Sequence, residues 1–172
     1  MGSSDDEDFY ELFLLPLEDR MLRTAWRIVR DPARAQDALQ DAMTVLWTRR
    51  ERIRAHPRPE ALILRICIDA SIDVLRKEAK HQRRRVIAEV DAVPAPTRTV
   101  ESGERQSEVL AAIGRLGGNQ ATAVFMRIVE EREYSEIALA LQCSETTARI
   151  HVMRGRARLR GMLGHLVDQD ER

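Results

Sequence analysis

The stretch EALILRICIDASIDVLRKEAK (residues 60–80) decides the fold of this chain. Its apolar residues recur at helical spacing on two separate stripes, so the predicted helix is covered over most of its circumference. The stripes consist of Ile63, Ile66, Cys67, Ala70 and Val74, and of Leu64, Ile68, Ile72 and Leu75. What remains is one narrow polar strip, formed by Arg65, Asp69, Asp73 and Arg76. We expect any function of this helix to lie in that strip.

Around this helix, the composition of the 172-residue chain favours an all-α fold. Aromatic residues make up only 4%, and there are 8 Gly and 6 Pro. A sandwich or barrel needs more β-formers and more turn residues than this. The 28 Lys and Arg balance the 28 Asp and Glu, so the net charge alone indicates no partner.

The charge is nevertheless unevenly distributed along the chain. Residues 1–19 carry a net charge of −7, residues 76–85 carry +5, and residues 142–163 carry +4. A basic block by itself is more often a solvated face than a nucleic-acid site. The acidic start is either a solubilising tail or a shield over one of the basic blocks while the protein is free.

A break in the helical pattern divides the chain into two modules. Pro94, Pro96 and Gly103 interrupt all helical periodicity between about residues 89 and 104. We therefore expect two small helical domains, at residues 1–88 and 108–172, joined by a flexible linker over residues 89–107.

The first module is predicted to contain three helices. The first runs from about Leu17 to Val29, and Asp31 followed by Pro32 has the signature of an N-cap and first helical residue for the second. Pro57 and Pro59 close the second helix, and the third is the helix of residues 60–80.

The second module is predicted to be a four-helix domain that contains a helix-turn-helix. Apolar spacing marks two helices, one over residues 109–116 and one over residues 124–129. Two more follow, from about Tyr134 to Leu141 and from Glu145 to Leu163. Only three residues separate them, with Ser144 as N-cap, and so tight a turn is typical of a helix-turn-helix.

The last predicted helix has an apolar face and a basic face. At 100° per residue its inward face is Ala148, Val152, Gly155 and Leu159, and its outward face is Thr146, Ile150, Met153 and Ala157. Arginines flank the outward face, and such a surface suits the major groove of DNA. The alternative is an ordinary helix pair whose last arginines complement the helix dipole.

Enzymatic and metal chemistry are not indicated. The four histidines are scattered (His56, His81, His151 and His165), and Cys67 and Cys143 lack the spacing of a zinc site. There is no glycine-rich phosphate loop, so we expect no catalytic residue, no cofactor, no metal and no small-molecule substrate. No apolar run approaches the roughly 20 residues that span a bilayer, and no signal peptide is evident. We expect a cytoplasmic protein without membrane insertion.

Two stretches are specific enough to indicate a family. AQDALQDAMTVLW (35–47) with RICIDASIDVLRK (65–77) resembles the first conserved domain of bacterial extracytoplasmic-function (ECF) sigma factors, and YSEIALALQCSETTARIHVMRGRARLR (134–160) resembles the second. The resemblance covers nearly the whole chain. It implies a non-enzymatic alternative sigma factor that binds core RNA polymerase, directs promoter-specific initiation and is controlled by an anti-sigma factor.

The resemblance also implies three sets of contact residues. Asp37, Gln40 and Asp41 would bind the clamp of core polymerase, although exposed carboxylates on a core helix are also found as a plain solvated face. The promoter minus-ten element would be contacted by Arg65, Asp69, Asp73, Arg76, Lys77 and Lys80. The minus-thirty-five element of the promoter DNA would be contacted by Thr146, Thr147, Arg149, His151, Arg154 and Arg158.

The chain departs from the family pattern at several of these positions. Asp69 stands where Asn is usual, Glu133 takes the place of Ser and predicts a weaker helix cap, and Gln142 replaces a glycine. Ile150-His151 replaces Ser-Arg, which leaves an apolar outward face for thymine methyl groups or a protein partner. These departures motivate a second hypothesis, a sigma mimic that sequesters an anti-sigma factor without supporting transcription.

Overall fold

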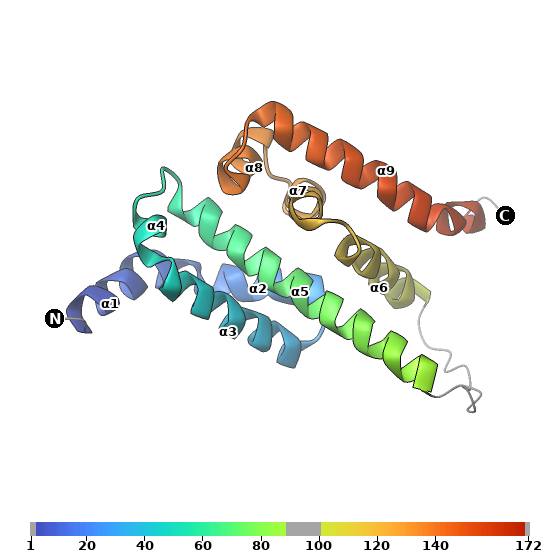
Figure 1. The fold of residues 1–172 in the computed structure, drawn as a ribbon, viewed down its shortest axis with the longest axis horizontal. Helices are drawn as coiled ribbons and strands as arrows, with labels where there is room; N and C mark the ends of the chain where they lie inside the picture. The colour runs from blue at the N-terminus through green and yellow to red at the C-terminus, as the bar shows by residue number, and fades with distance from the viewer. Residues whose placement is uncertain (1–2, 89–100, 171–172) are drawn as a thin grey trace.

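The computed structural model describes residues 3–88 and 101–170, and within these ranges it contains helices and no strand (Figure 1). The all-α prediction is therefore confirmed. The first group of helices is α1 (Ser3–Phe9), α2 (Glu18–Val29), α3 (Pro32–Thr48), α4 (Arg50–Arg54) and α5 (Pro59–Ala88). The second group is α6 (Glu101–Gly114), α7 (Gly118–Ile128), α8 (Tyr134–Leu141) and α9 (Glu145–Asp170).

The long helix α5 is the wall that the two groups share. It packs against α2 and α3 on one side and against α6, α7 and α8 on the other, as its course between the two layers in Figure 1 shows. Ile63, Ile68 and Ile72 are buried, as the two apolar stripes predict. The sequence predicts modules held by a linker, and in the structure the two groups of helices also pack directly on each other.

The predicted cap between the first two long helices is confirmed. Asp31 has an extended backbone, and its side chain accepts a hydrogen bond of 2.8 Å from the amide of Arg34. Arg30, just before it, adopts a left-handed conformation (φ 54°) that ends α2. Because this connection is so short, α2 and α3 lie antiparallel and together cover one face of α5.

The acidic start of the chain is more ordered than a solubilising tail. After α1 comes a π-helical turn (Tyr10–Leu14) and a 3₁₀ turn (Leu15–Leu17). Phe9 is fully buried, and its ring packs 5.5 Å from that of Phe13 and 5.4 Å from that of Trp47. Phe9 and Leu14 are five residues apart, a π-helical spacing, so a search for the α-helical period does not detect them.

The second group of helices begins inside the predicted linker. Helix α6 starts at Glu101, within the range 89–107, and residues 89–100 lie outside the described part of the chain. Ser102 and Gly103 suggested a break, but each costs a helix only about 0.5–1 kcal/mol relative to Ala, which tertiary packing of the helix offsets.

The helix-turn-helix is present, with α8 and α9 as its two helices. Ser144 caps α9, since its hydroxyl accepts a hydrogen bond of 3.1 Å from the amide of Thr147. Ala148, Val152 and Leu159 are buried, as predicted for the inward face. Gly155 lies between them at the crossing of α9 over α7, where a Cβ atom would overlap Cγ2 of Val124.

We predict that Gly155→Ala destabilises the fold by about 1–3 kcal/mol, because Val124 is stiff at χ1 and cannot move away without repacking α7. Gly161→Ala is the matched control on the same helix, because nothing lies within 4 Å of a Cβ atom there. Replacing that glycine is expected to stabilise α9 by about 0.5–1 kcal/mol. Urea unfolding of both variants measures the difference, and equal effects would contradict the proposed close contact.

Candidate nucleic-acid interface

The outward face of α9 is an exposed surface of mixed apolar and basic character. Thr146 and Arg154 are exposed, and Met153 retains 62% of its accessible surface. Ile150 is also exposed. The outward face predicted from the helical period is therefore the solvent-facing side of the helix-turn-helix, and it combines hydroxyl, guanidinium and apolar groups on one surface.

Arg149 is held in place by neighbours of the reading face. Its guanidinium lies 4.3 Å from the ring centroid of Tyr134 and 3.6 Å from the carboxylate of Glu145. Arg127 stacks on the same ring at 4.8 Å. A stacked, ion-paired guanidinium has fewer conformations to lose on binding, so Arg149 is the most preorganised cation of this face.

The other residues predicted to contact the minus-thirty-five element differ in availability. Thr147 is half-buried, and its amide and hydroxyl both interact with Ser144, so this threonine belongs to the helix cap. His151 is half-buried as well. Arg158 is exposed, and it donates a 3.0 Å hydrogen bond to the side chain of Gln120 at the start of α7.

The expectation of a weakened cap at Glu133 is wrong. The Glu133 side chain accepts from the backbone of Glu136, while Glu136 accepts a 3.2 Å hydrogen bond from the amide of Glu133. A carboxylate can replace the usual hydroxyl because it is an acceptor close to the positive end of the helix dipole. Gln142 does occupy a left-handed position (φ 54°), where glycine is favoured, and the side chain of Gln142 accepts a hydrogen bond from Arg52.

The carboxylates of α3 form a second exposed surface. Asp37, Gln40 and Asp41 lie on one face of α3, and all three are exposed. Asp41 is 3.5 Å from the ammonium of Lys77 on α5. The structure thus brings one residue predicted to bind the polymerase next to one predicted to bind the minus-ten element.

A groove between α3 and α5 connects the two predicted sets further. Its volume is about 460 Å³, and its polar lining includes Asp41, Asp69, Asp73 and Lys77. Three of these four groups are carboxylates, which repel phosphate and accept hydrogen bonds from amino groups. The groove therefore suits an amino-bearing base edge better than a sugar-phosphate backbone.

The polar strip of α5 faces the second group of helices. Arg65 donates to the carbonyl of Ala140 at the end of α8 (3.0 Å) and to the side chain of Asn119 (3.2 Å). Arg76 donates to two carbonyls after and at the end of α6, Gly114 (2.9 Å) and Leu116 (2.8 Å). Lys80, by contrast, is exposed, as is Lys77. The predicted minus-ten set is therefore split between covered arginines and exposed lysines.

Asp69 completes this interdomain surface. The hydroxyl of Thr122 on α7 donates to its carboxylate, and Arg65 lies 3.4 Å from the same side chain. Burial raises the pKa of the Asp69 carboxyl, the bond from Thr122 and the charge of Arg65 lower it in part, and the nearby charge of Asp73 raises it further. The carboxylate thus sits in an environment that disfavours its charge.

Sequence reasoning missed the residues of the second group that contact the strip. Asn119 and Thr122 on α7 and Glu130 after α7 are of this kind, and Glu130 accepts from Thr24 and Arg27 of α2. No motif marks them, and many of their counterparts are backbone carbonyls, which every residue possesses.

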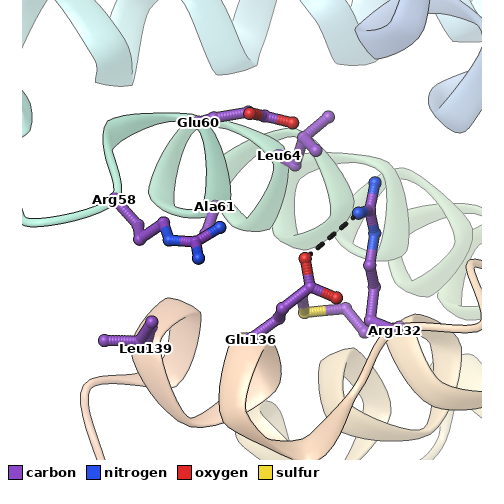
Figure 2. Close-up of a pocket in the computed structure, with 8 residues that line it drawn as sticks. Arg58, Glu60, Ala61, Leu64, Arg132, Glu136 and Leu139 are labelled. Atoms are coloured by element: carbon purple, nitrogen blue, oxygen red, sulfur yellow. Dashed lines mark hydrogen bonds and ion pairs between the residues drawn. The ribbon is translucent and has the colours of Figure 1, made fainter.

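A small cavity lies where the start of α5 meets α8 (Figure 2). Arg58, Glu60 and Leu64 border it on the α5 side, and Arg132 pairs with Glu136 across from them at 3.3 Å. Its volume of about 30 Å³ is close to that of one water molecule, so it is not a substrate site. Within the described residues there is no cluster of His, Cys, Asp or Glu that suits a metal, and no helix is long and apolar enough to cross a membrane.

Comparison with known families matches both halves of this arrangement. The family described as Sigma-70 region 2 matches residues 15–81, and the family described as Sigma-70, region 4 matches residues 106–159. The two matched ranges contain the exposed α3 surface and the helix-turn-helix, respectively. The fold and its surfaces are thus those of a protein of the sigma-70 class.

Relatives narrow the class. The chain is 30% identical over 147 residues to the ECF RNA polymerase sigma factor SigM of Mycobacterium tuberculosis, covering 86% of this chain and 71% of that one. It is 28% identical over 155 residues to the RNA polymerase sigma-E factor of Streptomyces coelicolor, covering 88% and 84%. A solved complex of the sigma factor RpoE with the anti-sigma factor NepR from Bartonella quintana is 19% identical, with a TM-score of 0.48 and coverage of 92% and 98%.

The chain belongs to the ECF RNA polymerase sigma factors. It is a non-enzymatic transcription initiation factor, whose partners are core RNA polymerase and promoter DNA. Both curated relatives are named as sigma factors of RNA polymerase, and the sigma-mimic hypothesis gains no support from them.

We predict that Asp69→Asn stabilises the folded protein at pH 7 and flattens its pH profile. Because folding raises the pKa of Asp69, the wild-type protein loses stability as the pH rises from the ordinary value of 3.8 through the raised value. The variant has no such group, so its advantage should vanish at the acidic end of the profile. Urea unfolding between about pH 4 and pH 8 measures this.

Asp19→Asn, at an exposed position of α2, is the control and should keep the wild-type dependence. An advantage of Asp69→Asn that grows towards acidic pH would contradict the assigned cause.

Proposed function

We propose that this sigma factor divides its work among three surfaces. Residues 1–88 would bind polymerase and the minus-ten element, and residues 108–172 would bind the minus-thirty-five element. The observation that carries this proposal is the two-sided character of α9, whose inward face is buried while its basic outward face is free for DNA. Such a helix in a helix-turn-helix has the geometry required to enter a major groove.

The α3 carboxylates are our candidates for the contact with core polymerase. Asp37, Gln40 and Asp41 project from one face of a helix whose opposite face is buried through Ala35, Ala38, Ala42 and Leu46. A rigid helix that presents carboxylates at spacing i, i+4 fits a basic partner surface, and charge complementarity raises the rate of association.

The minus-ten element is assigned to α5. The groove beside α3 offers carboxylates for the amino group of an unpaired base, while Lys77 and Lys80 offer charge for its backbone. Opening of the duplex requires such a place, because bases outside the stack need new partners.

Two further features follow from the family resemblance. The protein is proposed to act in the cytoplasm, where bacterial polymerase and promoters are found. An anti-sigma partner is proposed as its regulator, and the covered face of that partner is left to experiment.

We predict that Asp37→Asn combined with Asp41→Asn slows binding to purified core polymerase by about tenfold at low salt, because the pair supplies electrostatic attraction to the clamp. The difference should shrink as salt rises. Surface plasmon resonance with immobilised core measures the association rate. Asp19→Asn removes a carboxylate from α2 as the control, and equal rates for all three proteins would exclude α3 as the docking surface.

We predict different consequences for two arginines of α9. Arg154→Ala should lose about 1–3 kcal/mol of discrimination at one base pair, because Arg154 is placed to contact a base edge. Arg158→Ala should weaken binding to all sequences alike and reduce the slope of log affinity against log salt by about 1. Competition binding of duplex promoter fragments at several salt concentrations separates the two.

Arg23→Ala on the exposed side of α2 is the control and should change neither quantity. A uniform loss for Arg154→Ala would remove it from the base-contacting set.

A further inference from the structure

Three side chains assigned to the minus-ten element are engaged by the second domain in this structure. Arg65 contacts α8 and the start of α7, Asp69 contacts α7, and Arg76 contacts the end of α6. These residues lie on one strip of α5, and in Figure 1 the strip is on the side of α5 that meets the second layer of helices. The strip is thus occupied along its length.

The arginines of the strip have few hydrogen-bond donors left. Arg76 uses Nε for Gly114, Nη2 for Leu116, and Nη1 for the carboxylate of Asp73 at 2.8 Å. A bidentate contact with a guanine edge or a phosphate requires two neighbouring donors of one guanidinium. The Nε–Nη2 edge of Arg76 is filled by carbonyl oxygens, so this arginine cannot bind DNA in the observed arrangement.

Arg65 is engaged in the same manner. Its Nη1 and Nη2 donate to Ala140 and Asn119, and its Nε lies 3.4 Å from Asp69. Its side chain retains 22% of its accessible surface. A base or a phosphate would have to displace the second domain to reach it.

The contact extends beyond α5 to the opposite edge of the first domain. Glu130, in the connection after α7, is 3.2 Å from Arg27 and 3.4 Å from the hydroxyl of Thr24, both on α2. Its side chain retains only 11% of its accessible surface. The second domain is therefore fastened at α2 as well as along α5, which makes the arrangement more than a single fortuitous pair.

The covering is selective. Asp37, Gln40 and Asp41 on α3 remain exposed, and so do Thr146 and Arg154 on α9. The surfaces assigned to polymerase and to the minus-thirty-five element are therefore open, while the arginines assigned to the minus-ten element are closed.

We propose that the second domain is an intramolecular lid over the minus-ten surface, fastened by Thr122 on Asp69 and by Glu130 on Arg27, and that it must leave α5 before the promoter can be opened. This inference rests on the proposed function only in assigning the α5 strip to the minus-ten element. The closed arrangement itself is a property of the free chain and can be measured without DNA.

A reversible cross-link tests the proposal directly. A Cβ atom at Gly114 would lie 3.6 Å from Cβ of Leu75, within the range of about 3.5–4.5 Å found in disulfides. The double variant Leu75→Cys/Gly114→Cys, in a Cys143→Ser background, should therefore lock α6 to α5 on oxidation. Cys67 can stay, because it is buried and burial raises the pKa of its thiol to about 12.

The functional measurement is transcription by core polymerase of the source bacterium on its own sheared genomic DNA. We expect the oxidised protein to bind core as the reduced protein does, but to yield about tenfold less transcript or below, with recovery after reduction. The oxidised Cys143→Ser parent is the control for the oxidant. Equal transcription from the locked and the reduced protein would overturn the proposal.

Variants of the fastening residues provide a second measurement, which needs no DNA. Thr122→Val and Glu130→Gln keep the side-chain shapes and are outside every proposed contact set for DNA and polymerase. Introduced together into the cysteine pair, they should slow disulfide formation in the free protein several-fold, because the open state becomes more populated. Gly118→Ala on the same helix has open space around it and should leave the rate unchanged.

The two measurements separate the two claims. If the fastening variants cross-link as fast as the parent, the lid is wrong whatever the transcription shows. If they cross-link slowly but neither the reduced pair nor the wild-type chain starts transcripts with core, the lid is supported as a conformational device and the three-surface function fails.

Discussion

Two arginines of α5 cap the ends of helices that belong to the other half of the chain. The last carbonyls of a helix have no partner within it, and burying them in an interface is unfavourable unless a donor is supplied. Arg76 supplies donors at the end of α6, and Arg65 supplies one at the end of α8. Each arginine also brings positive charge to the negative end of a helix dipole, and each is balanced by an aspartate of its own helix. The way the two halves dock depends on these contacts.

The position of the DNA-facing surface follows from that docking together with one close contact. With α6 and α8 fastened to α5, α7 is held between the halves, and Gly155 brings α9 against it. Because no Cβ stands between α9 and Val124, the inward face of α9 is fully occupied by packing. Thr146, Met153 and Arg154 are then left to solvent. The same contacts that close the α5 strip thus support the helix that is free to bind DNA.

The sequence predicts what depends on local periodicity, and it does so well. The two apolar stripes of α5, the caps at Asp31 and Ser144, and the inward and outward faces of α9 are all confirmed. The docking of the halves has no such signal, because the acceptors for Arg65 and Arg76 are mostly backbone carbonyls. A polar strip on a helix shows that something contacts it, but its sequence cannot distinguish a helix end of the same chain from a nucleic acid.

The departure at Asp69 has a physical explanation within the chain itself. A strip made only for phosphate would carry cations alone, whereas here Arg65 is paired with Asp69 and Arg76 with Asp73, so the strip is close to neutral. A neutral strip gains little from long-range attraction to DNA and much from short, directed hydrogen bonds, such as that from Thr122. The carboxylate that suggested a sigma mimic is therefore accounted for by an intramolecular partner. With that motive removed, the exposed pair of Ile150 and Met153 is the only departure left to explain on α9, and two apolar side chains beside arginines are as suited to thymine methyl groups as to a protein.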